Sequence, residues 1–138
     1  MIIADTGFWV ALLDRRDNLH LKVRGCAAQI HEPLITTLPV ITEVCYFLQT
    51  RCGPGPSAEF LLAQRDGLFQ IFTFGESKLP RMAMLMQRYA NLPMDFADAS
   101  LVILAEHLDH GRIVSTDQRD FNAYRWKNHH PFSNLLET

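Results

Sequence analysis

The sequence predicts an α/β fold with a mainly parallel central sheet, and three observations lead to this prediction. Short apolar runs alternate with longer helical segments along the chain, which is the pattern of repeated strand–helix–strand units. Two of these runs, at residues 2–6 and 113–117, end in an acid beside a threonine. The 138 residues are 48% hydrophobic and 20% charged, a composition that excludes a disordered chain. We therefore expect residues 1–138 to form a single domain.

The first half of the chain supplies two of the expected strands. Residues 1–5 are an apolar run that ends in an acid and is bounded by Gly7, as in a buried parallel strand. A second short strand is expected at residues 34–36. Helices are expected at residues 8–13, 20–30, 39–51 and 57–66. The break at residues 52–56 holds two glycines and two prolines, and its shortness predicts a helical hairpin.

The second half continues the alternation of strands and helices. Residues 69–74 alternate weakly and predict a strand. Two helices, at residues 76–89 and 95–108, precede a strand at residues 112–116 and a turn or short helix after it. In the tail, a short strand is expected near Arg125-Trp126 or near Phe132. Right-handed crossovers bring the carboxyl ends of parallel strands to one edge, where ligands of such sheets bind.

Composition excludes several classes of function. The longest purely apolar run is six residues, whereas a membrane span needs about 20. The start of the chain lacks the basic segment of a signal peptide, so we expect a cytoplasmic protein with no membrane contact. Three cysteines without a CxxC pair give no zinc or disulfide signature. A net charge of −2 argues against a strongly basic nucleic-acid binder, although ten of the thirteen basic residues are arginine, which suits phosphate contacts.

Four acids are expected to approach the same edge of the sheet. Asp5 and Asp117 follow two of the predicted strands, Glu43 lies in a helix that is apolar nearly all round, and Asp98 lies one turn into another apolar helix. Each has an ordinary alternative: a helix cap for Asp5, an ion pair for Glu43, a helix-dipole contact for Asp98 and a turn for Asp117. The four together are harder to explain in that way.

The electrostatics of such a group indicate a bound cation. Two carboxylates about 4 Å apart repel by roughly 4 kcal/mol at an effective dielectric constant of about 20. No lysine lies near these acids in the sequence pattern, so a divalent cation is the simplest partner. Oxygen ligands without Cys or His favour Mg²⁺ or Mn²⁺. Two more acids lie close by, Asp120 three residues past Asp117 and Asp95, which is expected to cap the helix containing Asp98.

The combination of these residues resembles the PIN domain and, within it, the VapC-type toxins of bacterial toxin–antitoxin systems. The residues that carry the resemblance are Asp5-Thr6, Glu43, Asp95-Phe-Ala-Asp98-Ala and Ser115-Thr116-Asp117-Gln-Arg-Asp120-Phe121. It covers essentially the whole chain. It implies a PIN-like three-layer α/β/α fold and an Mg²⁺- or Mn²⁺-dependent endoribonuclease.

The resemblance also assigns roles by position. The family's acidic quartet falls on Asp5, Glu43, Asp98 and Asp117, with Asp5, Asp98 and Asp117 as the implied metal ligands. The auxiliary residues fall on Thr6, Thr116 and Asp120. Arg119 is the best candidate for contact with the RNA backbone, and its alternative is a solvated turn residue. One departure is Gly7, where many members of the family have Ser or Asn.

The implied partners are an RNA substrate, a cognate antitoxin and a second copy of the chain in a homodimer. Whether the RNA is a tRNA or an rRNA, and whether one or two metal ions bind, is left open by the sequence. Two alternatives remain. One is a non-nuclease Mg²⁺-binding receiver-like module, which would need a lysine at the end of a late strand. The other is an interaction domain in which residues 82–86 and the Phe8-Trp9 pair form a partner surface.

Overall fold

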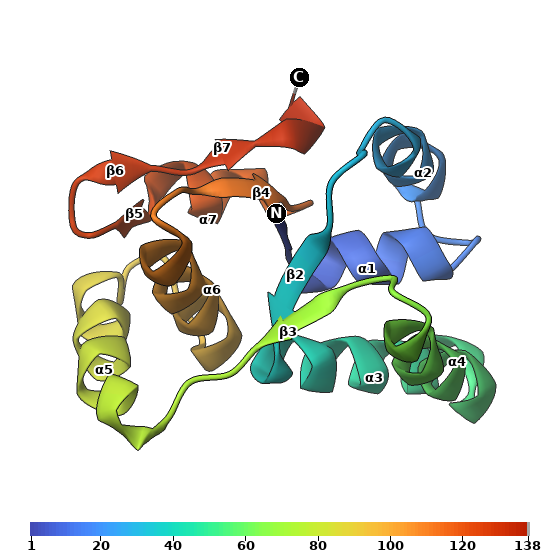
Figure 1. Cartoon of the computed structure of the whole chain (residues 1–138), viewed down its shortest axis with the longest axis horizontal. Helices are drawn as coiled ribbons and strands as arrows, with labels where there is room; N and C mark the ends of the chain where they lie inside the picture. The colour runs from blue at the N-terminus through green and yellow to red at the C-terminus, as the bar shows by residue number, and fades with distance from the viewer. Residues whose placement is uncertain (138) are drawn as a thin grey trace.

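The computed structural model describes residues 1–137, with Gln118 described by its backbone alone, and its centre is a five-stranded sheet (Figure 1). The strand order is β3-β2-β1-β4-β7, and every neighbouring pair is parallel. These strands are β1 (Ile2–Ala4), β2 (Leu34–Thr37), β3 (Gln70–Phe72), β4 (Arg112–Val114) and β7 (Ser133–Asn134). The predicted α/β class with a mainly parallel sheet is confirmed.

Helices cover both sides of this sheet. In Figure 1, α5 (Leu79–Arg88) and α6 (Phe96–Leu108) lie on one side. The helices on the other side are α1 (Thr6–Leu13), α2 (His20–Ala28), α3 (Leu38–Cys52) and α4 (Pro54–Arg65). A short helix, α7 (Gln118–Ala123), follows β4, and 3₁₀ turns span Glu76–Lys78 and Leu135–Glu137. The expected three-layer arrangement and the short helix after residue 117 are therefore confirmed.

The predicted helical hairpin is formed by α3 and α4, but the break between them is shorter than expected. Gly53 alone separates the two helices, with a φ of 84° that favours glycine. The second helix starts at Pro54, whereas the sequence predicted a break through residue 56. Because the first turn of a helix has no partner for its N–H groups, proline is tolerated there.

The tail is the part that the sequence predicted least well. A strand does occur at Arg125–Trp126, as expected, and this strand, β5, pairs in antiparallel fashion with β6 (His130–Pro131). Phe132 itself lies between β6 and β7 and is buried. The two residues of β7 then add a parallel strand beside β4. Thr138, the last residue of the predicted domain, lies outside the described residues.

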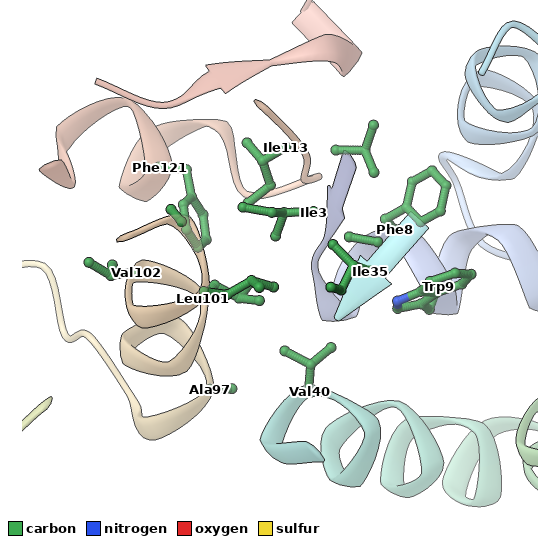
Figure 2. Close-up of a cluster of buried hydrophobic side chains, with 14 of the residues drawn as sticks. Ile3, Phe8, Trp9, Ile35, Val40, Ala97, Leu101, Val102, Ile113 and Phe121 are labelled. Atoms are coloured by element: carbon green, nitrogen blue, oxygen red, sulfur yellow. The ribbon is translucent and has the colours of Figure 1, made fainter. Parts of the chain in front are cut away.

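The core packs against both faces of the sheet. Figure 2 shows Ile3 and Ile35 of the central strands between Leu101 of α6 and Trp9 of α1. Phe8 and Trp9 are both 0% exposed, so the interaction-domain alternative was wrong to place them on a partner surface. The hydrophobic effect makes this burial a main source of stability. Within residues 1–137, no helix is both long and apolar enough to cross a membrane.

Candidate active site

The ends of β1 and β4 bring the first and last predicted acids together. Ile3 pairs with Ile113 and Ala4 with Val114, and the backbone N–H of Asp5 then donates to Val114 O (3.2 Å). The Ser115 hydroxyl donates to Asp5 Oδ2 (2.8 Å) and accepts from the N–H of Asp117 (3.0 Å). Ser115 therefore links the two acids.

Glu43 reaches the same edge from α3. Its Oε1 accepts a hydrogen bond from the Thr6 hydroxyl (2.8 Å), and Thr6 follows Asp5 directly. The side chain is partly exposed, although its helix buries Val40, Ile41 and Val44. The ion-pair alternative for Glu43 finds no support, because its bonded partner here is a neutral hydroxyl.

Asp98 enters the edge from the first turn of α6. Its backbone N–H donates to Asp95 Oδ1 (2.8 Å), and its own Oδ2 accepts from the N–H of Asp95 (3.2 Å), a reciprocal capping box. The expected capping role of Asp95 is confirmed. The Tyr124 hydroxyl lies 3.4 Å from Asp98 Oδ2 and 3.1 Å from the carbonyl of Leu92. Asp98 is thus oriented from two sides.

These side chains line one cavity of about 440 Å³, which we call the acidic cavity. Its walls include all of the predicted acids and threonines: Asp5, Thr6, Glu43, Asp95, Asp98, Thr116, Asp117 and Asp120. Arg51 also lines it, but its Nη1 lies 2.9 Å from Asp17 Oδ2 and 3.7 Å from Asp14 Oδ2. Within residues 1–137 no lysine lines this cavity, and the receiver-like alternative requires one.

Crowding in the acidic cavity raises the pKa values of its carboxyl groups. Burial is the main cause in every case, and neighbouring negative charges add to it. The pKa of Asp5 is raised to about 6, that of Glu43 to about 7 and that of Asp98 to about 8. Burial and the hydrogen bond with Asp120 also raise the pKa of Asp117. The cavity therefore favours any change that reduces its negative charge, by protonation or by a bound cation.

Helix N-termini act in the opposite direction and help to keep the acids ionised. Asp5 is the N-cap of α1, Asp95 that of α6 and Asp117 that of α7, and each side chain accepts a hydrogen bond from its own helix. The positive end of a helix dipole stabilises a carboxylate at this position. For Asp5, the capping alternative and the active-site prediction are therefore compatible.

The donor chemistry of the cavity fits a hard divalent cation, because every acidic ligand candidate offers oxygen only. The present arrangement is not a finished ligand set. Among the residues that the structure describes, no group of three or more His, Cys, Asp or Glu side chains is arranged to hold a metal ion. In this arrangement both oxygens of Asp5 accept hydrogen bonds, from the Thr6 N–H and the Ser115 hydroxyl, and Glu43 Oε1 accepts one from the Thr6 hydroxyl.

Gly7, the departure from the family's pattern, has a steric explanation. A Cβ atom on Gly7 would lie only 1.9 Å from Thr116 Oγ1. The hydroxyl of Thr116 therefore occupies the space in which a larger residue at position 7 would place its side chain. Gly7 and Thr116 both line the acidic cavity, so a polar group is present beside this position.

One predicted residue, Arg119, lies outside the lining of the acidic cavity, and three residues that the sequence did not predict contact the site. Arg119 is exposed on α7 and, within the described part of the chain, is not among the residues lining the acidic cavity. Its contact with RNA stays a prediction. The sequence analysis assigned no role to Ser115, Tyr124 or Arg51, although Ser115 lies in the quoted Ser115-Thr116-Asp117 stretch. Their partners lie far away in the sequence, so only the strand pairing and helix packing identify them.

Comparisons with known proteins agree with this geometry. The family model described as "PIN domain" matches residues 2–127. Ribonuclease VapC26 of Mycobacterium tuberculosis is 26% identical over 124 residues, which cover 90% of this chain and 92% of that protein. The crystal structure of VapC20 from Mycobacterium tuberculosis, named a sarcin-ricin loop cleaving toxin, superposes with a TM-score of 0.80. That match has 18% identity and covers 87% of this chain and 92% of VapC20, so it supports the fold alone.

Proposed function

Because this chain belongs to the PIN domain family, we propose that it is a metal-dependent endoribonuclease and the toxin of a toxin–antitoxin pair. One observation carries the proposal: acids from four separate segments, at residues 5, 43, 98 and 117, line one cavity. The ribonuclease name of VapC26 and the RNA-cleaving activity named for VapC20 are consistent with it. The reaction is hydrolysis of an RNA phosphodiester bond.

Asp5, Asp98 and Asp117 are the residues that would hold Mg²⁺ or Mn²⁺. When bound, such a cation lowers the pKa of a coordinated water and offsets charge on the leaving oxygen. The carboxylates gain from it as well, because a cation offsets the cost of burying their negative charge and the repulsion between them, which together raise their pKa values. Asp5 can accept the hydrogen bond from Ser115 and ligate the cation together, because each carboxylate oxygen carries two lone pairs.

Glu43 is proposed to handle the proton of the attacking water. Its carboxylate lines the acidic cavity together with the proposed metal ligands, where it can accept a proton from water. The hydrogen bond from the Thr6 hydroxyl keeps one carboxylate oxygen in a fixed direction. Thr6 is therefore a positioning residue, and Ser115 plays the same part for Asp5.

The proposed partners follow from the same family. We expect an RNA substrate, an antitoxin protein that restrains the activity and a homodimer of this chain. Arg119, which is exposed on α7 two residues after Asp117, is proposed to contact a phosphate of the RNA. Products are expected to carry 5′-phosphate and 3′-hydroxyl ends, since water attacks the phosphorus and the 3′ oxygen leaves.

The test is cleavage of total RNA by the purified chain in Mg²⁺, in Mn²⁺ and in EDTA, with the cut ends sequenced. Asp98→Asn should remove cleavage, because it deletes a charge that the cation needs. Asp66→Asn is the matched control, since this acid is exposed at the end of α4 and does not line the acidic cavity. Cleavage that persists in EDTA or in Asp98→Asn would rule out the proposal.

A further inference from the structure

A second cavity, of about 550 Å³, adjoins the acidic cavity, and the two share Glu43 and Asp95 as lining residues. The rest of its lining is mainly apolar and aromatic, with Leu38, Phe72, Phe74 and Phe96 among its walls. We call it the aromatic cavity. It lies among the first turn of α3, the segment after β3 and the start of α6, the region at the carboxyl end of β2 and β3 in Figure 1.

The aromatic cavity presents apolar surface that folding has not buried. Leu38 is 52% exposed and Phe96 is 44% exposed. The rings of Phe74 and Phe96 meet edge to face, with centroids 6.1 Å apart, so both rings are held in place. Phe72 and Phe74 also pack against the core, whereas Phe96 is exposed. Aromatic rings that line a concave site are typical of ligand binding.

A third cavity, of about 620 Å³, shares Phe72 with the aromatic cavity as a lining residue. Its lining carries the basic side chains Lys78, Arg81 and Lys127. Arg81 pairs with Glu106 and Lys127 with Asp109, whereas Lys78 forms no ion pair within residues 1–137. Acids, aromatic rings and basic groups therefore follow one another across this side of the molecule.

We propose that the aromatic cavity binds a nucleobase of the substrate RNA next to the cleaved phosphate, and that the RNA backbone continues toward Lys78. This inference rests on the proposed function. A polyanion is repelled by the acidic cavity, so its binding energy has to come from neighbouring groups. Unstacked bases of single-stranded RNA stack on aromatic side chains, and phosphates bind lysine and arginine. A nucleotide matches both sites, because its base suits the aromatic cavity and its phosphate suits the basic side chains.

Phe96 and Phe74 are then specificity-determining residues. Thr42 and Thr73 lie in the same lining. The Thr42 hydroxyl donates to the carbonyl of Leu38 (3.0 Å) and can still accept a hydrogen bond from the edge of the bound base.

Phe96 is the first residue of α6, directly after the N-cap Asp95. The first turn of α6 therefore carries both Phe96, whose ring would stack on the base, and Asp98, a proposed metal ligand. This arrangement would fix the base relative to the cleaved bond.

The binding test uses metal-free protein in EDTA and a single-stranded RNA octamer of mixed sequence with 2-aminopurine at its centre. Stacking quenches the fluorescence of this base, so titration reports its entry into the cavity. Phe96→Ala should weaken binding by about tenfold, the size expected for one lost base–aromatic stack. Phe96→Tyr should retain binding. Leu21→Ala, which removes an apolar side chain that is 74% exposed on α2, is the matched control.

Two further variants probe the cavity from other directions. Thr42→Phe fills it without removing any ring, and should weaken binding as Phe96→Ala does. Lys78→Ala should lower the slope of log affinity against log salt by about one, the value for one lost phosphate contact. Thermal melting of every variant identifies any loss of fold.

The outcomes separate this inference from the proposed function. If Phe96→Ala and Thr42→Phe bind the octamer as tightly as Leu21→Ala does, the cavity takes some other occupant, such as a partner protein, and the inference is wrong. If the wild type then still cleaves total RNA with Mg²⁺, the proposed function stands alone. If binding depends on Phe96 but the wild type cleaves no RNA, the nucleobase site is supported and the proposed nuclease function is wrong.

Discussion

Replacing Asp5 with asparagine should stabilise the metal-free protein while it abolishes metal-dependent cleavage. Asp5 is 6% exposed, and its pKa is raised from 3.8 to about 6, mainly by burial. Because each pKa unit corresponds to about 1.4 kcal/mol, the ionised form costs the fold about 3 kcal/mol at neutral pH. Asparagine removes this cost and keeps the cap, since it caps helices as well as aspartate does.

The sign of the pH dependence follows from the direction of the pKa change. The folded protein holds a proton on Asp5 more tightly than the unfolded chain does, so the wild type loses stability as pH rises from about 4 to about 6. The advantage of Asp5→Asn should therefore be small at pH 4 and full above pH 6. Because hydrogen bonds to the amide are weaker, the expected stability gain of Asp5→Asn falls to about 2 kcal/mol, which corresponds to roughly 5 °C in melting temperature.

Thermal melting in EDTA at pH 4.5, 6 and 7.5 measures this difference. Asp66→Asn is the control and should melt within about 1 °C of the wild type, because an exposed acid contributes little. Adding Mg²⁺ should then raise the melting temperature of the wild type more than that of Asp5→Asn. An Asp5→Asn variant that melts below the wild type at pH 7.5, or a gain that does not change with pH, would refute the reasoning.

Three other substitutions test separate parts of the structure. Gly7→Ala should lower stability by about 1–3 kcal/mol in thermal melting, because its Cβ meets Thr116 Oγ1 at 1.9 Å, and adding Thr116→Ala should restore it. Ser115→Ala should raise the pKa of Asp5, since a bond to its charged form is lost, and should move the pH profile of cleavage to higher pH; an unchanged profile would contradict this. Phe60→Ala should cost about 3–5 kcal/mol in urea unfolding, because the ring is 1% exposed.

Much of the fold could be predicted because the strands have simple sequence patterns. β1 and β4 are apolar runs that end in polar residues, and burial on both faces makes such runs recognisable. By contrast, β6 and β7 are two residues long and include Pro131 and Asn134, which carry no strand preference. Their pairing depends on neighbouring segments, so tertiary contacts decide it.

The acids of the site were predictable for a related reason: each lies where an apolar element ends or where an apolar residue is expected. Their partners were not. Tyr124 lies beside Asp98 because α7 ends next to the start of α6, and Ser115 bonds to Asp5 because of the register of β1 and β4. Hydrogen bonds between residues 26 and 110 positions apart leave no local pattern in the sequence.

The place of β1 between β2 and β4 has a consequence for the way this protein is made. On the ribosome, Asp5 emerges 112 residues before Asp117. Until residues 112–117 appear, β1 lacks its second neighbour and the acidic cavity lacks the wall that carries Ser115 and Asp117. A nascent or truncated chain that stops before this point has no complete site, so on the proposed function the translating cell meets an active nuclease only after residues 112–117 have been synthesised.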